Sequence, residues 1–425
     1  MTPEVRDRID QIRQGIVPEG YKKTKSGILP ESWSVRTIAE CLERVEHPVE
    51  VQANEMYTQI GIRSHGKGLF YKEPVTGDSL GNKSVFWIEP DCFILNIVFA
   101  WEQAIGKTTQ AEAGMIGSHR FPMYRPINGS IDIDYLISYL LTKRGTDILE
   151  AASPGGAGRN RTLGQDRFMK SRIVLPPLDE QKKIAEILAT QDKVIELQGR
   201  KIEELKRFKK GCLEKMFPRK GQKVPEKRFP GFTDDWEQRK LTEFVEFFSG
   251  LTYTPNDVQE NGTLVLRSSN VSNGEVVDAD NVYVNPQVVN SENVKVGDIV
   301  VVVRNGSRSL IGKHAQIKAF MPNTVIGAFM TGIRSECPKF TNALLNTSRF
   351  EEEIAMNMGA TINQITGYMF SKMEFKVPCL DEQKEIGEYF ENLDHLITLH
   401  QRKLEEMKKQ KKALMQLLLT GIERV

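Results

Sequence analysis

The sequence lacks any hydrophobic run long enough to cross a membrane. Its longest apolar stretch, residues 92–101, falls well short of the ~20 residues that a membrane-spanning helix requires. Residues 2–8 are charged where an export signal would be apolar. The five cysteines are scattered and odd in number, which argues against a disulfide framework. We therefore expect neither export nor membrane insertion, and we expect the chain to work in a reducing cytoplasm.

An excess of charge of either sign is also missing. Lys and Arg number 58 and Asp and Glu number 56, so the formal net charge is +2. A nearly neutral chain can still contact nucleic acid, but only through a local patch. With 425 residues, of which 40% are hydrophobic, the chain has material for two or three globular domains.

Catalytic and metal-binding motifs are missing as well. Residues 106–108 resemble the end of a phosphate-binding loop, but Trp101 stands where that loop requires its first glycine. The six histidines show no metal-ligand spacing. The adenine-flipping tetrapeptide of amino-methyltransferases, an Asn or Asp followed by two prolines and an aromatic residue, does not occur. We therefore expect a non-catalytic chain without a metal.

What the sequence does contain is one internal repeat. Residues 176–186 recur as residues 378–388, an offset of 202 positions, and the match continues without a gap at about half identity through the next two dozen residues. Upstream the repeat is fainter: Trp33 returns as Trp236, and the pair Arg63 and Ser64 returns as Arg267 and Ser268. Each stretch between tryptophan and repeat has the size of one domain, so the predicted order is body, helix, body, helix.

The repeated segments carry the pattern of long helices. Asp179 follows two prolines and is a natural N-cap, with acidic residues in the first turn. Apolar residues then recur at heptad spacing. The predicted seam consists of Ile184, Leu188, Ile195, Ile202 and Leu205 in the first copy and of Ile386, Phe390, Ile397, Leu404 and Met407 in the second. Two solvated surface helices are the alternative, but each stripe needs a partner and the other copy is the nearest, so we predict an antiparallel coiled-coil pair.

The bodies between these helices predict an α+β fold. Short β-rich runs lie at residues 93–99, 263–266 and 298–303, separated by Gly, Asn and Ser turns. Helical stretches lie near residues 135–143 and 342–356. The predicted fold class is thus α+β, with two mixed α/β bodies, two long antiparallel helices and an internal pseudo-twofold repeat.

Several loops of the bodies concentrate side chains that can read DNA. Arginine bonds guanine, and asparagine or glutamine bonds adenine, through two hydrogen bonds each. A single such loop is usually an ordinary solvated turn, and only the recurrence in both bodies favours DNA contact. The candidates are Arg63, Ser64, His65, Lys67, Arg159, Asn160 and Arg161 in the first body and Arg267, Ser268, Asn270, Arg304, Asn305, Arg308, Asn363 and Gln364 in the second.

Through these repeated helices, the chain resembles the specificity subunits of type I restriction-modification systems. The resemblance covers nearly the whole chain and rests on the repeated Pro-x-Leu-Asp-Glu-Gln-Lys helices at 176–217 and 378–419. The linker from Met216 to Trp236 and the segments 17–33 and 417–421 also fit. The loops are weakly patterned in this family, so only the scaffold carries over residue by residue.

The resemblance implies a division of the chain. It predicts an N-terminal helix and lead-in at 1–24, a target recognition domain at 25–176, a central helix at 177–217, a linker with a second target recognition domain at 218–378, and a C-terminal helix at 379–425. Each recognition domain would read one half of a bipartite double-stranded DNA site, and the helices would set the gap between the halves.

The resemblance also implies partners. Two methyltransferase subunits would bind S-adenosylmethionine, and two motor-nuclease restriction subunits would use ATP and Mg, so that no cofactor belongs to this chain. Three alternatives stay open: an orphan subunit that serves a methyltransferase only, an architectural coiled-coil protein, and a self-contained enzyme. The DNA target sequence cannot be derived from the sequence, because recognition also depends on loop geometry and DNA deformation.

Overall fold

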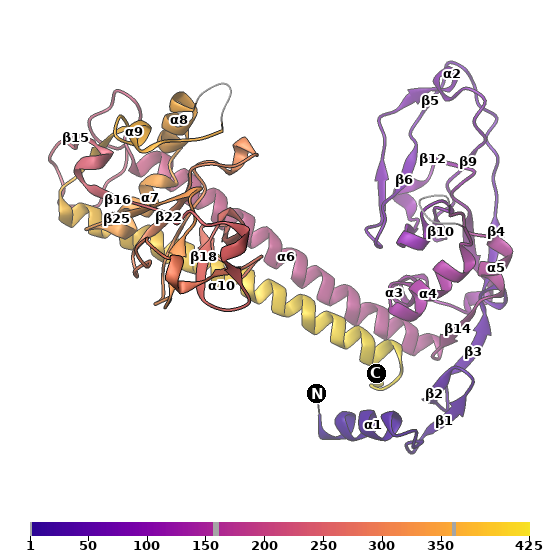
Figure 1. The fold of residues 1–425 in the computed structure, drawn as a ribbon. Helices are drawn as coiled ribbons and strands as arrows, with labels where there is room; N and C mark the ends of the chain where they lie inside the picture. The colour runs from indigo at the N-terminus through magenta and orange to yellow at the C-terminus, as the bar shows by residue number, and fades with distance from the viewer. Residues whose placement is uncertain (1, 156–160, 359–362) are drawn as a thin grey trace. The chain divides into compact units, whose positions relative to one another are not determined.

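The computed structural model describes residues 2–155, 161–358 and 363–425. The chain forms two compact units, Met1–Leu197 with Leu404–Val425 and Gln198–Lys403. The chain has two long helices, α6 (Leu178–Met216) and α10 (Leu380–Leu419). One part of each helix belongs to the first unit and the other part belongs to the second unit. Figure 1 shows them as the magenta and yellow helices.

The first unit is built on a four-stranded antiparallel sheet with the order β11-β10-β13-β4. Its strands are β4 (Leu42–Val45), β10 (Phe93–Leu95), β11 (Ile105–Lys107) and β13 (Met123–Pro126). Smaller antiparallel pairs join β1 (Tyr21–Thr24) to β2 (Gly27–Pro30), β3 (Ser34–Thr37) to β14 (Arg172–Leu175), β5 (Met56–Tyr57) to β8 (Val75–Thr76), β6 (Ile60–Ile62) to β7 (Leu69–Tyr71), and β9 (Val85–Trp87) to β12 (Ile116–Ser118). The helices are α1 (Pro3–Arg13), α2 (Gly77–Leu80), α3 (Ile133–Leu140), α4 (Lys143–Ala152) and α5 (Gln165–Lys170).

The second unit has an antiparallel sheet of the order β16-β25-β22-β23 and a second sheet, β17-β21-β18-β24, in which β18 and β24 run parallel. The first sheet consists of β16 (Val245–Ser249), β22 (Ile299–Val302), β23 (His314–Gln316) and β25 (Met330–Ser335), and the second of β17 (Val258–Gln259), β18 (Thr263–Leu266), β21 (Val282–Val284) and β24 (Thr324–Ile326). The remaining elements are β15 (Glu237–Lys240), β19 (Val271–Ser272), β20 (Glu275–Val276), β26 (Glu374–Val377), α7 (Pro338–Leu345), α8 (Ser348–Asn357) and α9 (Gly367–Phe370).

The two sheets share one topology although their sequences have diverged. β11, β10, β13 and β4 of the first unit correspond in order to β23, β22, β25 and β16 of the second. The pair formed by β3 and β14 likewise corresponds to the pair formed by β15 and β26. All four residues of β22 are buried, as expected for a central strand covered on both faces. The predicted α+β fold with an internal repeat is confirmed.

Each predicted helical stretch of the bodies is in fact two helices. Thr142 lies between α3 and α4. It caps α4, because its hydroxyl accepts a hydrogen bond from the Gly145 backbone N–H. Thr347 does the same for α8 by accepting from the Phe350 N–H. A threonine N-cap between two apolar runs marks a helix start, and this signal is present in the sequence.

The long helices are continuous, with 39 residues in α6 and 40 in α10. The observed N-cap of α6, Pro177, lies two positions before the predicted cap Asp179. Helix α6 begins at Leu178, and the Pro177 carbonyl accepts the first hydrogen bond, from the Gln181 N–H. Asp179 therefore lies exposed inside the first turn and is not the N-cap, although the acidic first turn is present. No helix among the described residues is long and apolar enough to cross a membrane.

Candidate nucleic-acid interface

The predicted seam of the long helices is the face that they bury. In α6, Ile184, Leu188 and Ile202 are buried and Ile195 and Leu205 are half-buried. In α10, Ile386, Phe390 and Ile397 are buried and Leu404 and Met407 are half-buried. The flanking acidic and basic residues are largely exposed, which is the division expected of paired amphipathic helices.

An ion pair joins the helices in each unit at repeated positions. In the second unit, the Lys209 ammonium lies 2.6 Å from a carboxylate oxygen of Asp394. In the first unit, Lys411 binds Asp192 in the same way. Both members of the second pair lie 202 positions from their equivalents in the first pair. Since the early half of one helix binds the late half of the other in both units, the helices pair antiparallel, as predicted.

A buried carboxylate ties the second body to the start of α10. Glu382 is 1% exposed and accepts hydrogen bonds from Trp236 Nε1 at 3.1 Å and from the Arg228 guanidinium at 2.7 and 2.8 Å. The bond to Glu382 raises the pKa of Arg228 above its ordinary value. The linker thus returns to the helix start, and the repeated Trp is a structural anchor.

The first unit repeats this anchor with a different source of the arginine. Glu180 is 5% exposed and accepts from Trp33 Nε1 at 3.0 Å and from the guanidinium of Arg424. The arginine at the start of α6 therefore comes from the tail that follows α10. The arginine at the start of α10 comes from the linker that follows α6. The hydrogen bond to Glu180 raises the pKa of Arg424.

In the second unit the structure brings together three predicted loops: the first at residues 267–270, the second at 304–308 and the third at 363–364. Ser268 accepts a hydrogen bond from the Asn305 amide at 3.0 Å, which joins the first loop to the second. Arg304 forms a backbone bridge with Gln364, and the Asn363 amide donates to the Gly306 carbonyl at 3.0 Å. The third loop therefore lies against the second. Arg304 and Arg308 are exposed at this cluster.

Two members of the first loop are occupied inside the fold. Asn270 is 1% exposed, and its amide donates to the carbonyl of Ala279 and to Asn281. The Arg267 guanidinium donates to Asp280 at 2.6 Å, and the Arg267 Nε is buried without a partner among the described residues. These bonds support a bracing role for both side chains.

In the first unit, two predicted loops lie against residues 101–102. Ser64 donates to the Glu102 carboxylate at 3.0 Å, and the His65 N–H donates to the Glu102 carbonyl at 2.8 Å. Arg161 lies over the Trp101 ring, 5.4 Å from its centre. Arg63 donates to the Leu69 carbonyl and covers the Phe70 ring, while Lys67 is exposed. Arg159 and Asn160 lie outside the described residues.

The loops that carry Arg161 and Asn363 occupy equivalent places in the two bodies. The Leu163 N–H donates to the Ile97 carbonyl, and the Ile365 N–H donates to the Val303 carbonyl, both at 2.8 Å. Ile97 follows β10 and Val303 follows β22, the corresponding central strands. Arg161 and Asn363 are therefore placed alike, although no shared motif marks them.

Sequence reasoning missed the aromatic rings and the acid at these clusters. Trp101 supports Arg161, Glu102 holds Ser64, and Phe329 lies 5.0 Å from the Arg304 guanidinium carbon. The only signal for Phe329 would have been its type, since it stands 25 positions after Arg304 in the sequence.

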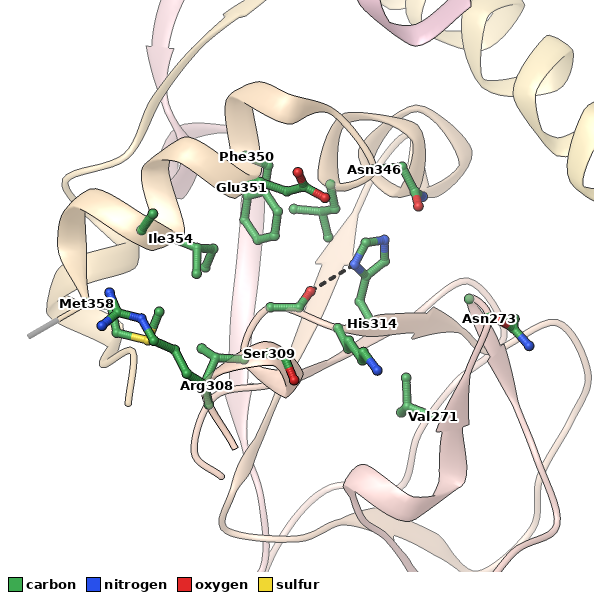
Figure 2. Close-up of a pocket in the computed structure, with 16 residues that line it drawn as sticks. Val271, Asn273, Arg308, Ser309, His314, Asn346, Phe350, Glu351, Ile354 and Met358 are labelled. Atoms are coloured by element: carbon green, nitrogen blue, oxygen red, sulfur yellow. Dashed lines mark hydrogen bonds between the residues drawn. The ribbon is translucent and has the colours of Figure 1, made fainter. Parts of the chain in front are cut away.

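A cavity of about 520 Å³ lies beside the loop that carries Arg308 (Figure 2). Its apolar wall includes Phe350 and Ile354, and Arg308 stands at its edge. His314 is buried and its Nδ1 lies 3.1 Å from the Gly312 carbonyl oxygen. Burial lowers the pKa of His314, so the ring is neutral. The residues described hold no cluster of three metal-binding side chains.

The sequence matches the family described as the type I restriction modification DNA specificity domain, over residues 84–207 and 233–409. The type I restriction enzyme MjaVIII specificity subunit of Methanocaldococcus jannaschii is 26% identical over 97% of this chain and 98% of its own length.

Two solved structures share the fold. A structure described as showing complex assembly and conformational transition of the type I R-M system matches with a TM-score of 0.60 at 17% identity, covering 93% of this chain and 99% of the other. The S subunit of a type I restriction-modification system from M. genitalium matches with a TM-score of 0.54 at 14% identity, covering 91% and 96%.

Proposed function

Because the chain belongs to the family of type I restriction modification DNA specificity domains, we propose that it is the sequence-specificity subunit of such a complex. Each unit reads one half of a bipartite site on double-stranded DNA. The observation that carries this proposal is the duplicated sheet topology, since the two sheets have one strand order and carry different loops.

The long helices set the spacer between the two half-sites in this proposal. Helices α6 and α10 each run without a break from one unit into the other. The ion pairs Lys209 with Asp394 and Lys411 with Asp192 fix their register. A change in helix length is therefore expected to change the gap and not the half-sites.

The subunit contributes recognition, and its partners contribute chemistry. We propose that it binds two methyltransferase subunits, which carry S-adenosylmethionine, and two restriction subunits, which use ATP and Mg. The chain itself orients DNA through its loop clusters and takes no part in bond making. A subunit that serves methylation without restriction is the second candidate, because the chain's own residues serve DNA reading equally in both cases.

The experiment is to map methylated adenines in a host that expresses the methyltransferase subunits with and without this chain. The proposal predicts one bipartite motif with an unspecified spacer, present only with the chain. Methylation that does not depend on the chain, or one uninterrupted motif, contradicts it. Adding the restriction subunit and measuring cleavage of unmethylated DNA separates the two candidates.

A further inference from the structure

An arginine stacked on an exposed aromatic ring stands at the loop cluster of the second unit. The Arg304 guanidinium carbon lies 5.0 Å from the centre of the Phe329 ring. Phe329 is 55% exposed. The stack fixes the plane of the guanidinium while leaving it at the surface.

The backbone beneath this stack is held from two sides. The Arg304 N–H donates to the Phe329 carbonyl at 3.2 Å, and Arg304 forms a bridge with Gln364. The next residue, Asn305, donates its N–H to the Asn363 carbonyl at 3.3 Å. Ring and guanidinium therefore start from one rigid base, which reduces the entropy that binding must overcome.

The donors of Arg304 are not consumed inside the fold. Among the residues that the structure describes, no carboxylate or carbonyl is bonded to its guanidinium, and the residue is exposed. Arg334 is the contrast. It also covers a ring, that of Phe248 at 4.8 Å, but its guanidinium binds Asp298 at 2.9 Å and Glu292 at 3.0 Å. Stacking alone therefore does not distinguish Arg304 from Arg334, whereas the unbonded guanidinium of Arg304 does.

The neighbours of Arg304 indicate which part of DNA it meets. The residues that adjoin Arg304 are the amides Asn305, Asn363 and Gln364. Arg308 is the second exposed cation of the cluster. A phosphate contact can be made by many donor types in many orientations, whereas reading a guanine edge needs a planar fork in a fixed orientation. Arginine bonds the O6 and N7 atoms of guanine with such a fork.

We propose that Arg304, held flat by Phe329, reads a guanine in the half-site bound by the second unit. Arg161 over Trp101 is a second arginine on an aromatic ring, in the first unit, although its loop corresponds to that of Asn363 and not to that of Arg304. Each half-site then contains a G·C pair, read by Arg304 in one half and by Arg161 in the other. This inference rests on the proposed function, to which it adds the arginines that read DNA and the base, guanine, that they recognise.

The test compares variants of the full chain assembled with its methyltransferase subunits. The methylated motif is mapped first, and binding is then measured on duplexes that carry each substitution of the motif, over a salt series. Arg304→Ala is expected to lose the preference for one G·C pair in one half-site, with about 10- to 100-fold weaker binding to the intact motif. Arg304→Lys keeps the charge and loses the fork, so it relaxes the same position while the salt slope stays unchanged.

Phe329 is a positioning residue, and its variants test the stack. Phe329→Leu is expected to relax the same base pair to a smaller degree, and Phe329→Tyr restores it. The matched control is Arg239→Ala. Arg239 also covers an aromatic ring, since its guanidinium carbon lies 5.9 Å from the centre of the Phe244 ring, but it does not belong to the three loops. The control should leave every position of the motif unchanged. Melting curves show that the variants fold.

Three results overturn the inference. Arg304→Ala can weaken all sequences evenly and lower the salt slope, which indicates a phosphate contact. It can leave the motif unchanged. The mapped half-sites can also lack a G·C pair. If the wild-type chain directs no bipartite motif, the proposed function fails instead, so the two failures are distinguishable.

Discussion

The side-chain nitrogen of Gln198 lies 2.9 Å from the backbone oxygen of His400, to which it donates. His400 is the repeat equivalent of Gln198, 202 positions later. In an antiparallel pair of repeated helices, a residue meets its own equivalent only at the midpoint of the pair. The polar interruption that the heptad pattern contains therefore marks that midpoint and fixes the register, as polar seam residues do in coiled coils.

Lengthening both helices at this midpoint should lengthen the spacer. Seven residues inserted after Gln198 and seven after His400 keep the ion pairs of both units and add about 10 Å of helix. At roughly 3.4 Å per base pair the gap should grow by about three base pairs. Motif mapping gives the spacer length.

The half-sites should keep their letters in this variant, because the loops are untouched. Insertion into α6 alone is the comparison, since the unextended α10 resists the change. An active complex with doubly lengthened helices and an unchanged spacer would show that the helices do not set the distance.

Removing the Glu382 carboxylate should destabilise the second unit. Glu382→Ala leaves the Arg228 cation and the Trp236 N–H without their buried acceptor, and breaking such a pair costs about 3–5 kcal/mol. Asp381→Ala is the matched control, because Asp381 is exposed one position earlier. Denaturant unfolding measures both. Equal losses in the two variants would remove the anchoring role from Glu382.

The stability of the second unit should fall as the pH drops below 6.5. His314 has a lowered pKa in the folded chain, so below the ordinary value of 6.5 the unfolded chain takes up a proton that the folded chain refuses. The loss begins near pH 6.5, ends at the folded pKa and is at most about 1.4 kcal/mol per pH unit. Lys209 lowers this pKa and Asp394 raises it, while burial dominates.

The measurement is the melting temperature between pH 7.5 and 5.5. His314→Gln should flatten the pH dependence, because an amide does not titrate. The same slope in wild type and variant would assign the pH dependence to other groups.

Arg267→Ala should lower stability by about 1 kcal/mol, since its partner Asp280 is largely exposed. The double variant with Asp280→Ala should lose no more than either single variant, because both remove one interaction. The sequence predicts DNA contact for Arg267, and this stays a prediction. A relaxed motif at unchanged melting temperature would assign Arg267 to base reading rather than bracing.

The sequence predicts the scaffold well and the loop clusters poorly, for physical reasons. Heptad residues such as Ile184 and Ile386 recur at a period that only a paired helix buries, so one face of α6 and α10 follows from spacing. The helix starts at Leu178, ahead of the predicted cap, and Glu180 in its first turn bonds Trp33. That contact joins residues 147 positions apart, and no local pattern encodes it.

The loop residues illustrate the same limit. Asn270 and Arg304 are both polar loop residues in the sequence, yet Asn270 is buried with a bonded amide and Arg304 is exposed on a ring. The difference comes from Ala279 and Phe329, which lie elsewhere in the chain and approach only in the fold. Residue type therefore predicts candidate DNA-contacting residues, and tertiary contacts determine which of their side chains are buried and bonded and which stay exposed.

The claim that each body reads its own half-site is tested most directly by exchanging residues 25–176 for the corresponding segment of another family member and mapping the methylated motif. One half-site should change while the other half-site and the spacer length stay as in the wild-type motif. A motif in which both half-sites change together would contradict modular reading by the two bodies.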